Sequence, residues 1–246
     1  SENLMAKLAG EAVRDIPYYG LMETTLKDVE IVISQTGFTG EKGYEIYVRD
    51  AHQNAEIVWN AVLEGGEEFG LQVVAPAHHR RIAAGIVSWG QDLDFETSPF
   101  QVNLSYQVPR NKKADYIGKE ALERQRAAID GGNFPFKMRM VGLILGGKQI
   151  TDYAPDFWLI ADTNGNDMGY ITSPWWSPEL NTNIALGWVP AASSEVGTKL
   201  LVRLPDEYSE SSGVPVEGEI VDVPFRESVN PNIREVAKAK GLDYAE

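Results

Sequence analysis

Residues 33–48, with the sequence ISQTGFTGEKGYEIYV, predict two short strands joined by a turn with three glycines spaced three residues apart. A single carboxylate, Glu45, lies inside the second strand. Because side chains alternate between the two faces of a strand, Tyr44 and Ile46 share one face, and Glu45 and Tyr47 share the other. A Glu45 that faces water needs no ligand, whereas a Glu45 that lines a cavity can accept two parallel N–H bonds from a planar heterocycle. The alternation alone favours the water-facing alternative.

The glycine-rich turn is predicted to be a hairpin whose glycines supply positive φ. It lacks the lysine and serine of a phosphate-binding loop, and it joins strand to strand where such a loop runs into a helix. The sequence contains no H-E-x-x-H, G-x-S-x-G, Walker or dinucleotide-binding motif. Its three histidines, His52, His78 and His79, have no second pair of ligands at metal spacing. We therefore expect neither a metal site nor a catalytic triad.

The composition predicts an acidic globular protein. Its 246 residues are enough for one large domain or two ordinary ones, with 43% hydrophobic and 24% charged residues. A net charge of −14 disfavours binding to nucleic acid or to anionic lipid. No apolar run has the length of a membrane span, and the chain has no cysteine, which excludes disulfides and thiolate metal sites. We expect a cytoplasmic protein with no nucleic-acid and no membrane partner.

Residues 1–132 alternate between predicted helices and strands. A short N-terminal helix precedes the strand pair, and Asp50 begins a D-x-x-Q capping box for the helix that follows. A further helix is predicted from Pro76 to a stop at Gly90, and another over residues 116–128. This part of the chain is expected to form an α+β domain.

A change of composition near residues 129–137, IDGGNFPFK, marks the expected domain boundary. Short β-like runs follow at residues 138–145, 157–162, 167–173, 183–190, 199–205 and 216–225. Several short strands with frequent turns are typical of a small barrel or sandwich. Asn230 and Pro231 then begin a predicted C-terminal helix that Gly241 ends. We expect an all-β domain with a terminal helix over residues 133–246.

Two further groups of residues are candidates for ligand binding. Arg81 and Trp89, eight residues apart, could stack and bind an anionic aromatic ligand, or they could be an ordinary surface arginine and a core tryptophan. Trp175 and Trp176 lie between two prolines in a stretch predicted to be a loop. Exposed aromatic residues in a loop favour binding, whereas buried ones anchor the loop.

Five stretches, in the same order as in the family, resemble the glycine-cleavage T protein (aminomethyltransferase) and its tetrahydrofolate-dependent relatives. They cover residues 34–48, 81–108, 116–122, 169–190 and 196–225. The first is similar to the family motif S-R-T-G-Y-T-G-E-x-G-(F/Y)-E-I, and the second to the segment that begins R-L-E-A-G. The third, YIGKEAL, matches F-I-G-(R/K)-E-A-L, and the last two follow the pattern of the family's C-terminal β-domain.

The resemblance implies a partial folate-binding α+β domain followed by a small all-β barrel. It also implies an enzyme that moves a methyl or aminomethyl group from a small-molecule donor to tetrahydrofolate, as an aminomethyltransferase or a dimethylsulfoniopropionate demethylase does. In the family, the glutamate of G-(F/Y)-E-I accepts hydrogen bonds from the pterin ring, and Glu45 occupies that position. The folate-contacting arginine falls on Arg81, and the tyrosine of the second motif is Trp89. Phe38 and Trp176 complete the implied cofactor-binding residues.

Three departures from the family pattern bear on these expectations. Ala83 replaces the glutamate that follows the family's arginine, which removes a partner that could orient Arg81. Pro174 replaces a glycine beside the tryptophan pair and stiffens that stretch. The chain is also shorter than family members and lacks the segment that carries their catalytic aspartate, so no catalytic residue is assigned.

The shorter length leaves three alternatives for function. The first is a one-carbon transferase. We expect its partner to be a companion chain that supplies the missing N-terminal half, or a carrier protein. The second alternative is a noncatalytic folate-binding or regulatory module of the same fold. The third is a protein that keeps the fold for interaction only, with Glu45 in water.

Overall fold

The computed structural model describes residues 1–225 except residues 111 and 155. The described residues divide into two compact units, which we call unit 1 (residues 1–77) and unit 2 (residues 78–225). The expected domain boundary near residue 133 lies inside unit 2 and stays a prediction. The expected C-terminal helix falls outside the described residues. In the described part of the chain, no helix has the length and apolar character that a membrane span requires.

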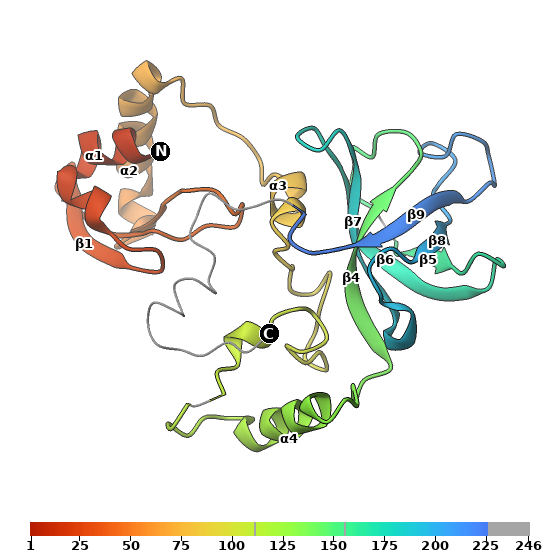
Figure 1. Cartoon of the computed structure of the whole chain (residues 1–246). Coiled ribbons are helices and arrows are strands. Elements are labelled where there is room, and N and C mark those ends of the chain that lie inside the picture. The colour runs from red at the N-terminus through yellow and green to blue at the C-terminus, as the bar shows by residue number, and fades with distance from the viewer. Residues whose placement is uncertain (111, 155, 226–246) are drawn as a thin grey trace. The chain divides into compact units, whose positions relative to one another are not determined.

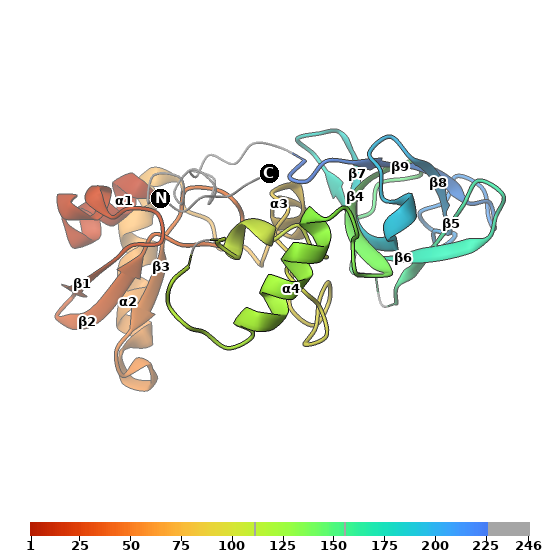
Figure 2. The same cartoon turned by 60° about the horizontal axis from the view of Figure 1, so that its bottom comes forward.

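Unit 1 is a three-stranded antiparallel sheet with two helices packed on one face (Figure 2). Its elements are α1 (Glu2–Ala9), β1 (Leu21–Leu26), β2 (Val29–Ser34), β3 (Glu45–Val48) and α2 (Ala51–Gly66), with 3-10 turns at Glu11–Asp15 and Glu67–Phe69. The central strand is β2. The helix expected after Asp50 is present as α2, but the Asp50 side chain makes no capping hydrogen bond, so the capping box does not form.

The two faces of this sheet differ in chemistry because side chains alternate along each strand. Ile31 and Ile33 of β2 are buried against the helices, in a core cluster that Ile46 joins. Ser34 pairs across the ladder with Glu45, so both belong to the opposite face. Glu45 and Tyr47 are exposed there. The alternation in the sequence therefore predicted correctly which residues of β3 face away from the core.

Unit 2 contains a closed six-stranded barrel in which all neighbouring strands are antiparallel (Figure 1). The strand order is β4-β7-β6-β5-β8-β9, and pairing of β9 with β4 closes the barrel. The strands are β4 (Met138–Leu145), β5 (Trp158–Ala161), β6 (Asp167–Ser177), β7 (Thr182–Pro190), β8 (Lys199–Val202) and β9 (Val216–Val221). The α+β class and the C-terminal barrel are thus both confirmed.

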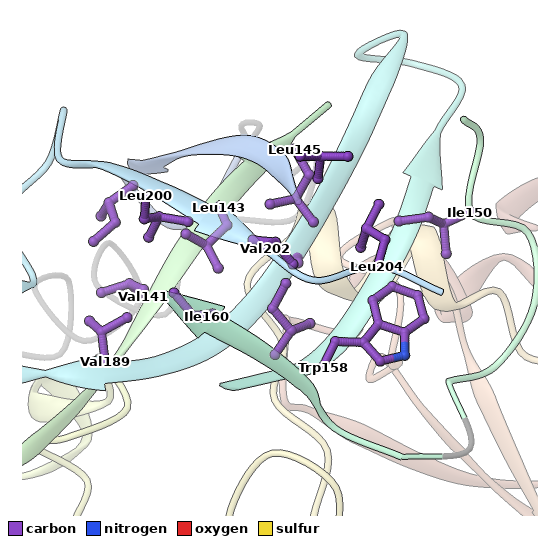
Figure 3. Packing of buried hydrophobic residues seen from close by; sticks show 14 residues of the cluster. Val141, Leu143, Leu145, Ile150, Trp158, Ile160, Val189, Leu200, Val202 and Leu204 are labelled. Carbon is purple, nitrogen blue, oxygen red and sulfur yellow. The ribbon is translucent and has the colours of Figure 1, made fainter. Parts of the chain in front are cut away.

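The barrel is filled by aliphatic side chains and Trp158, which point inward from its strands (Figure 3). At the end of β4 the side chains alternate, because Leu143 and Leu145 are buried whereas Ile144 between them is 40% exposed. Close approach of β6 and β7 requires glycine at position 169, where a Cβ atom would overlap the carbonyl oxygen of Trp188. Such alternation, with small residues where backbones meet, is what closes a sheet around a packed interior.

Before the barrel, unit 2 contains α3 (His78–Ala83), α4 (Lys119–Asp130) and a 3-10 turn at Ser105–Gln107; another turn, Ala191–Ser193, follows β7. The helix expected from Pro76 to Gly90 is therefore wrong in length. Gly85 adopts φ +69, a left-handed conformation that ends the helix, and its amide donates to the carbonyl of Ile82. The loop expected around Trp175 and Trp176 is also wrong, because both lie on β6.

The barrel core offers a matched pair of variants. Leu143→Ala should destabilise the protein by roughly 2–5 kcal/mol, because it removes a fully buried side chain and leaves a cavity. Ile144→Ala removes the same number of carbons from the outer face and should cost much less. Urea unfolding followed by tryptophan fluorescence measures both, since five of the six tryptophans lie in unit 2. Equal losses for the two variants would contradict the assignment of the barrel interior.

Candidate functional site

The carboxylate of Glu45 is held by two hydroxyl groups. Thr36 Oγ1 and Tyr47 Oη both donate to the same carboxylate oxygen, Oε2, the second at 3.1 Å. Thr36 lies close to Ser34, whose hydroxyl is 3.1 Å from Thr36 Oγ1. The two hydroxyls orient the carboxylate while it remains exposed, and they leave Oε1 available to accept an N–H donor from a ligand.

An open hollow of about 410 Å³ lies against the same part of the sheet. Its lining residues come from all three strands and the residue after β3: Leu21, Val32, Ser34, Tyr47, Val48 and Arg49. The lining combines aliphatic side chains with a hydroxyl, a phenol and a guanidinium, the mixture expected of a site for a planar polar ring. Tyr47 belongs both to this lining and to the contacts of Glu45. Glu45 therefore stands beside a surface that can receive a ligand.

In the glycine-rich turn between β2 and β3, the backbone conformation requires glycine at only one of the three glycine positions. Gly40 has φ +71, in the left-handed region, whereas Gly37 and Gly43 do not have positive φ. A Cβ atom at Gly37 would meet nothing within 4 Å. The expectation that all three supply positive φ is therefore wrong for two of them. Phe38, within the same turn, is half exposed.

The hydrogen bond to Glu45 raises the pKa of Tyr47, because loss of the phenolic proton would place two negative charges side by side. Glu45→Gln removes the charge and keeps the shape, so the pKa of Tyr47 should fall back toward its ordinary value of 10. An NMR titration of labelled tyrosine ring carbons in both proteins measures this shift. A Tyr47 pKa that is the same in both proteins would show that the contact does not form in solution.

Arg81 lies in unit 2, at the centre of a buried polar network. Its side chain leaves α3 and is 2% exposed. All five of its N–H donors have acceptors: His78 Nδ1 at 3.3 Å, the carbonyl of Ile86 at 3.1 Å, Asp92 Oδ2 at 2.8 Å, Gln91 Oε1 at 3.2 Å and Ser173 Oγ at 2.8 Å. A guanidinium with every donor engaged in this way is held in one orientation.

The charge of Arg81 is balanced by Asp92, which is also fully buried. Asp92 Oδ2 accepts the amide of Ser88 at 2.7 Å in addition to Arg81, and Oδ1 accepts the hydroxyls of Thr172 at 2.6 Å and Ser173 at 2.5 Å. The expectation that Arg81 lacks an orienting partner is therefore wrong. The substitution at Ala83 is irrelevant to that role, because the orienting carboxylate comes from the segment after α3.

The two implied tryptophans of unit 2 differ in their surroundings. Trp89 is 57% exposed, and its ring packs edge-on against Phe95 with the centroids 4.6 Å apart. Trp176 is partly buried on β6, and its amide donates to the carbonyl of Ile150 at 2.7 Å. The sequence did not identify Asp92, Thr172 or Ser173 as site residues, although all three lie inside the motifs that resemble the family. Ligand binding by the five implied residues stays a prediction.

Asp92→Asn should destabilise the protein by roughly 3–5 kcal/mol, because it leaves the buried Arg81 charge without its counter-charge. Asp94→Asn, two residues later and exposed, is the matched control and should change stability by less than about 0.5 kcal/mol. Urea unfolding monitored by tryptophan fluorescence reports both. If Asp92→Asn were as stable as the parent, the ion pair would not be what holds the segment after α3.

Two family models match the chain in order. The "GCVT N-terminal domain" model matches residues 1–112, and the "Glycine cleavage T-protein C-terminal barrel domain" model matches residues 139–225. Together they account for most of the sequence, and the second coincides with the observed barrel.

Individual relatives agree with these matches. The chain is 32% identical to a dimethylsulfoniopropionate demethylase from Ruegeria pomeroyi, over 84% of the chain and 53% of the relative. It is 33% identical to an aminomethyltransferase from a Synechococcus species, over 82% of the chain and 52% of the relative. A crystal structure of the glycine cleavage system aminomethyltransferase T from Bartonella henselae has the same fold, with a TM-score of 0.73, 24% identity, and coverage of 92% of this chain and 57% of that chain. The chain spans about half the length of the curated relatives it matches.

Proposed function

Because the chain belongs to the glycine cleavage T-protein family, we propose that the protein transfers a methyl or aminomethyl group from a small-molecule donor to tetrahydrofolate. The relatives that are an aminomethyltransferase and a dimethylsulfoniopropionate demethylase support this class of reaction. The observation that carries the proposal is the oriented carboxylate of Glu45 beside the hollow of unit 1.

Glu45 is proposed to bind the pterin ring. Its Oε2 is occupied by the Thr36 and Tyr47 hydroxyls, so the ligand would meet Oε1. A planar ring with N–H groups on one edge suits a single oriented carboxylate acceptor beside a hollow whose lining includes Leu21 and Val32. Phe38, exposed in the turn beside this carboxylate strand, is proposed to cover the ring from the side of the turn. The residues present therefore fit the group.

The chemical contribution of the chain is proposed to be binding and orientation. When bound, tetrahydrofolate supplies the amine that accepts the one-carbon unit. Holding that amine at a fixed place relative to the donor replaces a bimolecular encounter and contributes most of the rate enhancement in this kind of catalysis. The donor, and a carrier protein or companion chain with the rest of the catalytic machinery, are the proposed partners.

For the unit 2 residues we propose different roles. The saturation of all five Arg81 donors supports an indirect role, in which Arg81 holds His78 and the segment around Asp92 in place. The exposure of Trp89 supports a direct contact with the ligand or with the donor. Trp176 is partly buried, so its proposed contribution to cofactor binding is made from the exposed part of its ring.

A noncatalytic folate-binding module is the second candidate. It is favoured by the position of the Glu45 site, whose described contacts all come from residues 20–49 of unit 1, so binding does not require the catalytic residues of the relatives. An assay of transfer to tetrahydrofolate by the chain together with the proposed companion chain separates the two, because a module binds folate and transfers nothing.

Glu45→Gln is the test of the binding site. Calorimetric titration with tetrahydrofolate should give saturable binding to the parent chain and binding at least roughly tenfold weaker to the variant, since a hydrogen bond to a charged acceptor is lost. Glu56→Gln, an exposed glutamate on α2, is the matched control and should bind as the parent does. Equal affinity of Glu45→Gln and the parent would refute the assignment. If the chain alone shows no binding, the same comparison is made with the proposed companion chain added.

A further inference from the structure

A cluster of three aromatic rings lies on unit 2 where α3, β6 and the segment between β4 and β5 meet. His78 stacks on Trp175, with ring centroids 5.3 Å apart and an interplanar angle of 29°. Tyr153 packs edge-on against both rings, at 4.2 Å from His78 and 5.7 Å from Trp175. The Tyr153 side chain is 56% exposed, and His78 and Trp175 are partly buried. The proposed folate site of Glu45 uses none of these residues.

The hydrogen bonds of His78 determine where its proton lies. Its Nδ1 accepts a hydrogen bond from Arg81 Nε, so this nitrogen carries a lone pair. The neutral ring must then carry its proton on Nε2, which is in hydrogen-bond contact with Tyr153 Oη. The pKa of His78 is lowered below its ordinary value of 6.5 by burial, which is the larger cause, and by the positive charge of Arg81. The ring is therefore neutral at pH 7.

This arrangement leaves a hydrogen-bond donor at the surface. Because His78 Nε2–H donates to Tyr153, the phenol oxygen acts as acceptor in that contact, and its own hydrogen is free to point elsewhere. Within the described residues, the Tyr153 hydroxyl makes no other hydrogen bond. The O–H group of Tyr153 therefore lies beside the partly exposed ring of Trp175. Its orientation is fixed by the hydrogen bonds that run from the buried Arg81 through His78 to Tyr153.

The charges near Tyr153 restrict the ligand. Asp152 and Asp156, close to it in the chain, are both exposed and would repel an anion. Lys148 is a cation of the same segment, but its charge acts on Asp206. The pKa of Asp206 is lowered mainly by hydrogen bonds from Ser212 and Gly213, and less by Lys148. An uncharged acceptor suits this environment better than a carboxylate does.

We propose that His78, Tyr153 and Trp175 form a binding site for a planar conjugated group that carries an uncharged hydrogen-bond acceptor, of which an aryl amide is the simplest example. The acceptor binds the Tyr153 hydroxyl, and the plane of the group packs against the exposed aromatic rings. His78 is a positioning residue, since it acts through Tyr153. The pterin site proposed at Glu45 of unit 1 is not needed for this binding.

The test uses benzamide as the probe and the whole chain. Benzamide should shift the indole N–H resonance of Trp175 saturably in NMR spectra, with Trp175→Phe assigning that resonance. Tyr153→Phe should weaken binding roughly fivefold, the size of one neutral hydrogen bond. Tyr116→Phe, which removes a hydroxyl from the segment before α4, should bind as the parent does. Benzoate should bind more weakly than benzamide.

The pH dependence tests the role of His78. The charged and titratable groups that face it are Arg81 from α3, Asp92 from the following segment and Tyr153. Protonation of His78 Nδ1 would make that nitrogen a donor that faces the Nε–H donor of Arg81, and their hydrogen bond would be lost. The benzamide affinity of the parent should therefore fall as the pH is lowered below 6.5. In Tyr153→Phe the affinity should not change with pH in this range.

Three outcomes would overturn the proposal. They are the absence of a saturable Trp175 shift up to the solubility limit of benzamide, an unchanged affinity in Tyr153→Phe, and a benzoate affinity equal to or above that of benzamide. An equal pH dependence in the parent and in Tyr153→Phe would refute the positioning role of His78.

Discussion

The buried ion pair between Arg81 and Asp92 is the interaction on which the arrangement of unit 2 depends. It joins α3 and the segment after it to β6 through Ser173, and Trp188 of β7 donates its indole N–H to the carbonyl of Asp92 at 2.9 Å. Moving two charges out of water costs several kcal/mol per ion, which good geometry and further hydrogen bonds must offset. Here every donor of Arg81 and both oxygens of Asp92 have partners, so the network holds one geometry.

Glu45 shows the opposite use of a carboxylate in the same chain. Asp92 accepts four hydrogen bonds in the interior and serves the fold. Glu45 is exposed, and its two hydroxyl donors share one oxygen. An exposed carboxylate keeps its hydration until a ligand displaces it, and prior orientation by Thr36 and Tyr47 lowers the entropic cost of that exchange. Burial and the number of donors thus separate a structural acid from the acid that we propose binds the pterin ring.

His78 connects the interior of unit 2 with its surface. It receives a hydrogen bond from Arg81 and passes one to Tyr153, so the orientation of an exposed phenol depends on a buried ion pair. Hydrogen bonds in series polarise one another, and a low local dielectric strengthens them. A short helix such as α3 suffices for this, because its three-residue spacing places His78 and Arg81 on the same side.

The sequence by itself determined the elements whose signal is local. Period-two alternation predicted that Glu45 and Tyr47 share the outer face of the sheet, and the apolar runs after residue 137 predicted the barrel strands. The tertiary structure alone decided the partner of Arg81, because Asp92 and Ser173 lie 11 and 92 residues away in the chain. It also decided that Trp175 lies on a strand beside His78. Local patterns record which side of an element is buried, whereas a hydrogen bond between distant residues depends on distances that exist only in the folded chain.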